Sequence, residues 1–177
     1  MKVVLINGPY GAGKDTFGNI LQEQCFGLGR QRVLHINFAD WVKDACRRYL
    51  NWNGDKTTEA GRSLLQYFAT DLVRTNDPDY WGDVVARLCW AVRNEYDLVI
   101  VADFRFPNEY DCFLKLFSPE DILTIHIDRD MPADKETRHH ISENSLKDFV
   151  FDYYIDNNGP ISNLEDSAVE IGANICY

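Results

Sequence analysis

A glycine-rich loop near the start of the chain constrains the fold more than any other feature. It reads Gly-Pro-Tyr-Gly-Ala-Gly-Lys-Asp-Thr over residues 8–16, directly after the apolar run 3–6 and before a helical pattern. Glycines let backbone N–H groups curl around phosphate oxygens, and the start of the helix adds a favourable dipole. A strand, such a loop, a lysine and a helix in this order are typical of a site for a nucleoside triphosphate. The alternative is a glycine-rich turn that opens a helix by chance.

The residue after the lysine departs from the usual pattern of these loops. Ser or Thr normally stands there and holds magnesium, but this chain has Asp15 and places Thr16 one residue later. Asp15 can bind magnesium directly or through water, or it can be an ordinary first-turn acid that the helix dipole favours. Sequence does not separate the two. The residues expected to bind ATP are Gly8, Tyr10, Gly11, Ala12, Gly13, Lys14, Asp15 and Thr16.

Apolar runs alternate with helical patterns along the rest of the chain. Strands are expected at 33–38, 97–103, 122–127 and 153–155, and helices at 41–50, 58–74, 77–92, 107–116 and from 162 onward. Pro78 is expected at the first position of its helix, and Ser162 to Glu165 reads as a capping box. The alternation predicts an α/β fold of the P-loop NTPase type. We expect three layers, a central parallel sheet of about five strands and a short lid, in one domain over residues 1–177.

Asp103 ends the most apolar of the expected strands. In a P-loop fold a carboxylate at this strand end is well placed to hold magnesium. The alternative is that it caps the helix that Pro107 opens. Arg105 is expected to face the same edge of the sheet, because ligands of open α/β sheets bind at the carboxyl ends of the strands. Asp103, like Asp15 and Thr16, is therefore a candidate ligand for Mg²⁺, with the alternative roles left open.

A polar stretch at 128–140 interrupts the alternation. It mixes basic and acidic side chains: Arg129, Lys135, Arg138, His139 and His140 with Asp128, Asp130, Asp134 and Glu136. It can be a solvated loop, or a lid over about residues 128–142 that closes over the phosphates, excludes water and brings arginines to the transferring group. Because the chain has a phosphate-binding loop, the lid is the favoured interpretation of this stretch. The two adjacent histidines lack further ligands at metal-binding spacing.

The charge balance narrows the set of partners. The 177 residues carry a net charge of -10, so polymeric nucleic acid is not an expected partner, whereas a few arginines can still form a local pocket for a mononucleotide. Five scattered cysteines without metal or redox spacing indicate reduced thiols in a cytoplasmic protein. The chain begins with a strand rather than a signal peptide, and no apolar run is long enough to span a membrane. A homodimer remains an open alternative to a monomer.

The helix expected at 58–74 has one apolar side and one polar side. Arg62 and Arg74 lie outside the apolar stripe, where they are either solvated or available to a phosphorylated acceptor. The four tryptophans are expected in packing contacts, with Trp41 or Tyr67 as the aromatic residues that could lie near an acceptor.

These pieces together resemble the deoxynucleoside monophosphate kinases of tailed bacteriophages, a branch of the P-loop kinases. The similar segments are GKDT at 13–16, NFAD at 37–40, GRSLLQ at 61–66 with Arg74 and Trp81 downstream, DFRFPNE at 103–109, HISE at 140–143 and IDNNG at 155–159. The GKDT loop is shared with other small-molecule kinases. Its combination with the segments at 61–66 and 103–109 is much more specific to this family.

The resemblance implies a kinase that transfers the terminal phosphate of ATP to a deoxynucleoside monophosphate with magnesium. In that family's terms Lys14 would hold the transferred phosphate, and Arg105 with Arg129 or Arg138 would neutralise charge during transfer. The residues that would organise the magnesium cofactor are Asp15, Thr16 and Asp103. The acceptor would bind in a helical region at about 40–95. Its expected contacts are Asp40, Lys43, Arg62, Gln66, Arg74 and Asp103. Ala69 stands where a Gly is expected, which leaves the base preference open. A phage protein of this kind would work in the host cytoplasm.

Two other functions share some of these features. A P-loop kinase for another small phosphate, such as phosphomevalonate or dephospho-coenzyme A, would use the same loop, but the segments at 103–109 and 140–143 argue against it. A regulator that binds ATP without turnover would be expected to have lost the strand-end acid or the lid arginines, and this chain keeps both. A panel of acceptors separates the three.

Overall fold

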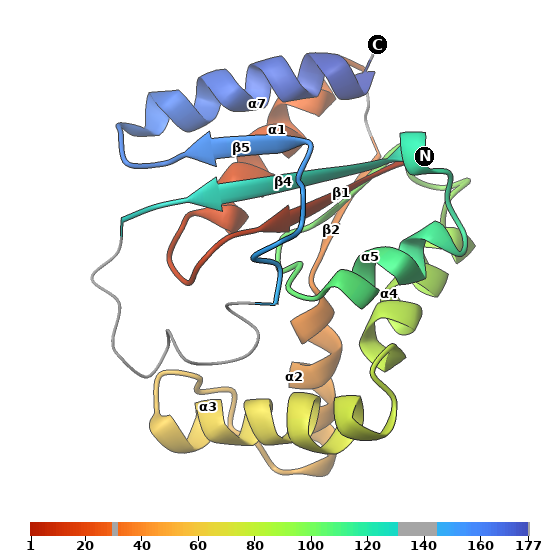
Figure 1. Cartoon of the computed structure of the whole chain (residues 1–177), viewed down its shortest axis with the longest axis vertical. Helices are drawn as coiled ribbons and strands as arrows, with labels where there is room; N and C mark the ends of the chain where they lie inside the picture. Colours follow the sequence, from red (N-terminus) through yellow and green to blue (C-terminus); the bar gives the residue numbers. More distant parts are fainter. Residues whose placement is uncertain (30–31, 131–144, 177) are drawn as a thin grey trace.

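A computed structural model describes residues 1–29, 32–130 and 145–176. Its centre is a five-stranded sheet with the order β2-β3-β1-β4-β5, in which every neighbouring pair is parallel (Figure 1). The strands are β1 (Lys2–Asn7), β2 (Val33–Ile36), β3 (Leu98–Val101), β4 (Ile122–Asp128) and β5 (Tyr153–Asp156). Both the sheet and its parallel character confirm the fold predicted from the alternating sequence.

The register brings the carboxyl ends of the strands to one edge. Leu5 of β1 lies opposite Val101 of β3 and Thr124 of β4, so the segments that follow these strands leave the sheet side by side. The middle strands are buried on both faces, which explains why β1 and β3 are apolar at nearly every position.

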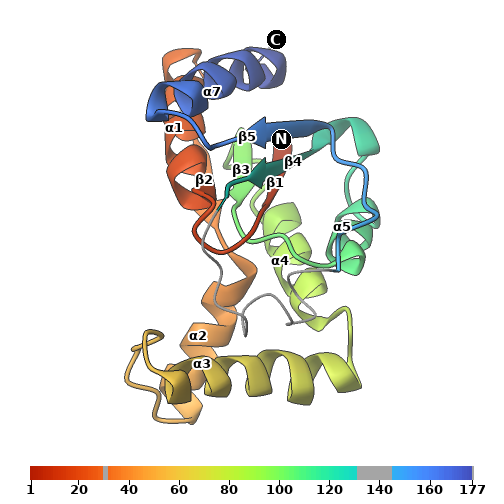
Figure 2. The ribbon, with the colours of Figure 1, turned by 60° about the vertical axis from the view of Figure 1, so that its left-hand side comes forward.

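Helices cover both faces of the sheet and make three layers (Figure 2). α1 (Lys14–Gly27) and α7 (Ile161–Cys176) pack together on one face, over a core that includes Phe17, Ile125 and Ile171. α4 (Tyr80–Ala91) and α5 (Pro107–Leu114) pack on the other face, over Val99, Phe104 and Phe113. Each helix turns its apolar side to the sheet, so the two cores are separated only by the sheet itself.

A helical arm, residues 38–76, projects from the sheet and has a small core of its own (Figures 1 and 2). It comprises α2 (Phe38–Tyr49), α3 (Glu59–Gln66) and η1 (Tyr67–Arg74). Val42, Cys46 and Trp52 are buried against Trp81 of α4, and apolar side chains of α3 and η1 pack on them. The arm lies within the region where the acceptor was expected.

The helix predicted at 58–74 contains an unexpected π-helical segment. α3 continues directly into η1, whose eight residues wind as a π-helix instead of an α-helix. The indole Nε1–H of Trp81 donates to the Ala69 carbonyl in this segment over 3.2 Å. π-helical turns are rare and occur often at functional sites.

Several predicted boundaries were wrong. β2 ends at Ile36, because α2 already begins at Phe38. Pro78 lies in the turn before α4, which begins at Tyr80, so it is not a first helical residue. α7 begins at Ile161, which puts Ser162 inside the helix and not at its cap. Each observed boundary differs from the predicted one by only a few residues.

No helix in the described ranges has the length and apolar character that crossing a bilayer requires. All five cysteines are free thiols, and four of them are buried.

Candidate active site

The glycine-rich loop forms an open cradle between β1 and α1. Gly8 and Gly13 adopt φ angles of 151° and 94°, which side chains rarely tolerate. A Cβ atom at Gly8 would lie 2.3 Å from the carbonyl oxygen of Ile127, so this loop needs glycine there for space as well. The N-cap of α1 is Gly13, which has no side chain to accept the first N–H groups of the helix. These N–H groups are therefore oriented for an anion, as in other phosphate-binding loops.

Lys14 lies folded over this cradle. Its ammonium donates to the carbonyl oxygens of Gly8 and Pro9 over 2.6 and 2.8 Å. These contacts hold the cation at the mouth of the loop, where a phosphate group would meet it. Asp15 and Thr16 follow in the first turn of α1, and both are exposed.

Asn157 is a part of the cradle that the sequence analysis missed. This buried side chain follows β5, and its Nδ2 donates to the carbonyl of Ala12 over 2.8 Å. A Cβ atom at Gly13 would lie 2.7 Å from the same nitrogen. Asn157 thus buttresses the phosphate-binding loop from behind. The only sequence signal was the IDNNG segment at 155–159, which forms part of the family resemblance but has no assigned role.

The β3–α5 turn, residues 102–106, lies directly beside the loop. Phe104 N–H donates to the Ile6 carbonyl over 3.0 Å, and the Asn7 side chain donates back to the Phe104 carbonyl over 2.7 Å. The same Asn7 side chain offers its oxygen to Nδ1 of His126 on β4 at 2.7 Å. Burial lowers the pKa of His126, so its ring is neutral at pH 7, with the Nδ1 hydrogen donated to Asn7. Three strand ends are therefore tied together at the mouth of the loop.

Asp103 has a partner that neither sequence interpretation anticipated. Its two carboxylate oxygens accept the N–H groups of Phe38 and Ala39, at 2.7 and 2.9 Å, in the first turn of α2. It therefore caps α2, and the idea that it caps the helix at Pro107 was wrong. Burial raises the pKa of Asp103, an effect that these two N–H groups oppose. Its role as a magnesium ligand stays a prediction.

Glu109 on α5 is the most buried carboxylate near the site, with 1% of its surface exposed. Its Oε2 accepts the N–H groups of Arg105 and Phe106 over 2.8 and 3.1 Å, and its Oε1 pairs with the Arg74 guanidinium. That guanidinium also stacks on the Phe106 ring, 4.1 Å from its centroid. Burial raises the pKa of Glu109 to about 7, against the opposing effect of Arg74. Glu109 is the last residue of the DFRFPNE segment at 103–109, and no pattern in the sequence predicts this role for it.

The other predicted acceptor residues lie on the arm. Arg62 and Gln66 are exposed on α3, and Lys43 on α2 forms an ion pair with Asp40 at 3.0 Å. Arg74 lies on η1 and, unlike these, turns inward. Of the predicted lid, Arg129 is exposed just after β4. Arg138 and both adjacent histidines lie outside the described residues.

The described residues offer oxygen donors for the predicted magnesium ion but do not form a complete metal site. Within the described residues no group of three or more His, Cys, Asp or Glu side chains could hold a metal ion. Magnesium in phosphoryl-transfer enzymes is commonly bound by one or two carboxylates together with the substrate phosphates. The exposed oxygens of Asp15 and Thr16 fit such a partial set.

The sequence matches the deoxynucleotide monophosphate kinase family over residues 42–168, which is well over half of the chain. The chain belongs to this family. The match runs from α2, through the arm and the Asp103–Glu109 segment, to α7. The family confirms the resemblance seen in the sequence, and it identifies the protein as an ATP-dependent phosphotransferase that acts on nucleotides.

Solved structures similar to this kinase share its fold at low identity. An APS kinase from Mycobacterium tuberculosis is 13% identical with a TM-score of 0.54, covering 98% of this chain and 95% of its own. A sugar kinase from a Janibacter species is 14% identical with a TM-score of 0.56, covering 99% and 95%. A shikimate kinase from Acinetobacter baumannii, solved with shikimate, is 19% identical with a TM-score of 0.50, covering 99% and 93%. Among proteins with curated descriptions, none matches the sequence.

Proposed function

We propose that this kinase uses the cradle at Gly8–Thr16 to bind ATP and transfers its γ-phosphoryl group to the phosphate of a deoxynucleoside monophosphate. A phosphate oxygen of the acceptor bonds to the γ-phosphorus, the bond to the β–γ bridging oxygen breaks, and ADP leaves. One observation carries the proposal. The phosphate-binding loop, the Arg105 turn and the arm that bears Arg74 are joined by hydrogen bonds and an ion pair at one sheet edge.

The chain's own residues would contribute position and charge. N–H groups of the loop and the ammonium of Lys14 would hold the β- and γ-phosphates. Arg105, with Arg129 and Arg138 from the lid, would balance the charge that spreads over the transferring group. Such a reaction needs little covalent participation by the protein, because positioning and electrostatic stabilisation supply most of the rate.

The acceptor would bind between the arm and the sheet edge. Arg62 and Gln66 are exposed on α3, and the Asp40–Lys43 pair lies on α2. Arg74 and Asp103 are the inward-facing members of the proposed acceptor set. Guanidinium groups suit this task, because they recognise phosphate in a planar, two-point geometry.

Asp15, Thr16 and Asp103 would hold Mg²⁺, which, when bound with the triphosphate, neutralises charge on the β- and γ-phosphates. A single kinase domain over residues 1–177, a phage origin and a place in the host cytoplasm stay predictions, and a homodimer stays an open alternative to a monomer. Polymeric nucleic acid is not a proposed partner, given the net charge of -10.

The decisive test is ADP release from ATP and magnesium with each common deoxynucleoside and ribonucleoside monophosphate supplied separately. We expect release that depends on one or several of the deoxynucleotides. Arg105→Ala should abolish transfer and keep the circular dichroism spectrum of the native protein. If ATP binds but none of the nucleoside monophosphates stimulates ADP release, the proposed function is wrong.

A further inference from the structure

Both ends of the helical arm are anchored to one short segment, residues 103–109. At its first residue, Asp103 accepts N–H groups from Phe38 and Ala39, where the arm leaves the sheet. At its last residue, Glu109 pairs with Arg74, where the arm returns. Between these two carboxylates lies Arg105. The segment therefore connects the region proposed for the acceptor with a residue proposed for the transferring phosphate.

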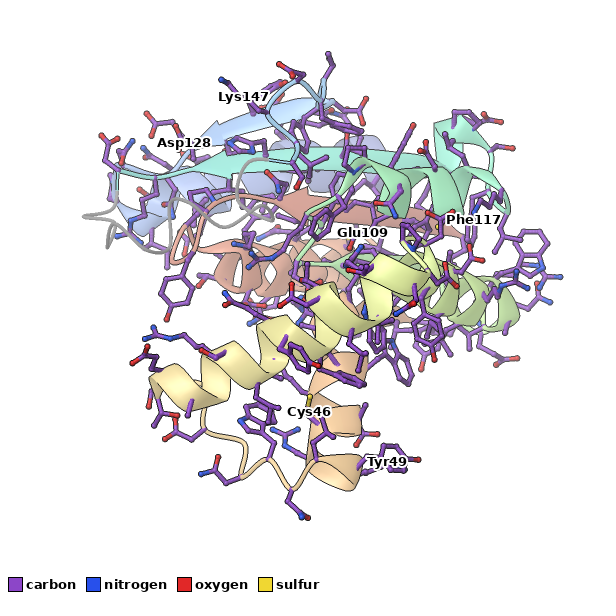
Figure 3. All side chains as sticks on the ribbon, turned by 60° about the horizontal axis from the view of Figure 1, so that its bottom comes forward. Cys46, Tyr49, Glu109, Phe117, Asp128 and Lys147 are labelled. Atoms are coloured by element: carbon purple, nitrogen blue, oxygen red, sulfur yellow. The ribbon has the colours of Figure 1, made fainter. Side chains whose placement is uncertain are left out.

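The two oxygens of Glu109 have separate partners. Oε2 accepts the backbone N–H groups of Arg105 and Phe106, which fixes the path of the turn. Oε1 takes the guanidinium of Arg74, which lies 35 residues earlier in the chain and on another element. One carboxylate thus holds both the turn and the arm. Figure 3 shows the labelled Glu109 where the helix of the arm passes the start of α5.

Arg74 is held on two further sides. Its guanidinium stacks on the Phe106 ring, and one nitrogen reaches the Pro78 carbonyl at 3.5 Å. Only 13% of the Arg74 side chain is exposed, against 1% for Glu109. A largely buried guanidinium depends on the carboxylate that pairs with it, because removal of either leaves a charge away from water without that partner.

We propose that Glu109 is a positioning residue that sets the distance between the acceptor site and Arg105 by holding Arg74 and the Arg105 turn on one carboxylate. This inference rests on the proposed function, since it assigns a role within the same site. Its structural alternative is that Glu109 only caps α5 through Oε2. The two differ in what Oε1 does.

Glu109→Gln separates the two roles. The amide oxygen can still accept the N–H groups of Arg105 and Phe106, but the amide nitrogen then faces the Arg74 guanidinium, donor against donor. We expect the KM for the deoxynucleotide to rise by about 10-fold or more, the loss typical of one hydrogen bond to a charged group, while the KM for ATP stays within about 2-fold. A deoxynucleotide KM that stays at the wild-type value would overturn the inference.

A matched control uses another carboxylate that accepts backbone N–H. Asp152, which precedes β5, accepts the N–H and hydroxyl of Thr124, the third residue of β4, and contacts neither Arg74 nor the Arg105 turn. Asp152→Asn should lower the melting temperature without changing either KM. If it raises the deoxynucleotide KM as much as Glu109→Gln does, general loosening explains both results and the inference fails.

A double-mutant cycle with Arg74→Met tests the route of the effect. If Glu109 acts through Arg74, the double variant has a deoxynucleotide KM within about 2-fold of Arg74→Met alone. Independent, multiplying effects would overturn the inference. Should Glu109→Gln fail to fold, Glu109→Asp replaces it, because the shorter acid keeps its charge and cannot reach both partners. Wild-type enzyme without any deoxynucleotide-dependent turnover would instead contradict the proposed function itself.

Discussion

The phosphate-binding loop and the helical arm are held by different kinds of contact. The loop lies between adjacent elements, and its local shape depends on glycine φ angles and on the Lys14 contacts to Gly8 and Pro9, with Asn157 as a buttress from a distant segment. The arm has its own small core and is joined to the sheet by partners 35 to 65 residues away. The loop can therefore be recognised from its sequence motif, whereas the arm is positioned only when the whole chain has folded.

The comparison predicts that the two regions fail in different ways when their key contacts are removed. Changes in the loop should stop transfer and leave acceptor recognition intact. Changes in the arm should weaken the acceptor and leave ATP binding intact.

The largest effect is expected from Lys14→Ala. Loss of the ammonium over the loop removes the cation that would meet the β- and γ-phosphates, and kcat should fall by about 10³-fold. Lys2→Ala is the matched control, because Lys2 pairs with Asp121 at the other end of β1. Steady-state ADP release measures both. Normal turnover by Lys14→Ala would remove this lysine from the mechanism.

The second-largest effect is expected when the deoxynucleotide KM, which reports on the arm, is measured as a function of pH. Burial raises the pKa of Glu109 to about 7, so its carboxylate is charged at pH 8 and gains a proton as the pH falls below 7. The groups that face it are Arg74 and Asp103, with the N–H of Arg105. We expect the deoxynucleotide KM to rise by about 10-fold between pH 8 and pH 6 in the wild type.

Glu109→Gln supplies the control for this titration, because the substrate phosphate also titrates near pH 6. The variant should keep a high deoxynucleotide KM with only the substrate's own dependence on pH.

The pKa of Glu109 also sets the direction in which the free energy of unfolding changes with pH. A folded pKa above the unfolded one means that the wild type loses stability relative to the variant as pH rises from about 4.5 to 7. Parallel curves for the two proteins would contradict the assigned titration.

Trp81→Phe should have a smaller effect that is confined to the arm. It removes the indole hydrogen bond to the Ala69 carbonyl and leaves that carbonyl of the π-helix without this donor. We expect a loss of about 1–2 kcal/mol in the free energy of unfolding, and a larger change in the deoxynucleotide KM than in the ATP KM. Trp90→Phe is the control, since this more exposed indole packs on Phe117 away from the arm. Denaturant unfolding and kinetics compare the two.

The smallest effect is expected from Ala69→Gly, which restores the residue expected from the family resemblance. Ala69 packs against the arm's core, so the change should cost about 0.5–1 kcal/mol of stability. It should also broaden the set of accepted bases, because a side chain near the acceptor region is removed. Ala173→Gly on α7 is the control for backbone entropy alone. An unchanged base preference would separate Ala69 from specificity.

Sequence determined much of the fold because its signals are local. The apolar runs at 3–6 and 98–101 indicate parallel strands that are buried on both faces. The glycines at 8–13 indicate a loop whose backbone needs φ angles that other residues rarely adopt. The family could also be predicted, because its motifs Gly13–Thr16, Arg62–Gln66 and Asp103–Glu109 are contiguous in the sequence. Each of these could be identified before any contact in space was known.

Tertiary structure decided which side chains act together. No spacing in the sequence pairs Asp103 with the first turn of α2, Glu109 with Arg74, or Asn157 with the loop at Ala12. Nor does any local propensity explain why Tyr67–Arg74 winds as a π-helix beside Trp81. Hydrogen bonds between distant segments depend on the arrangement of the folded sheet, whereas strand and loop signals depend only on neighbouring residues. That difference in range is the physical reason why the motifs were visible in the sequence and their partners were not.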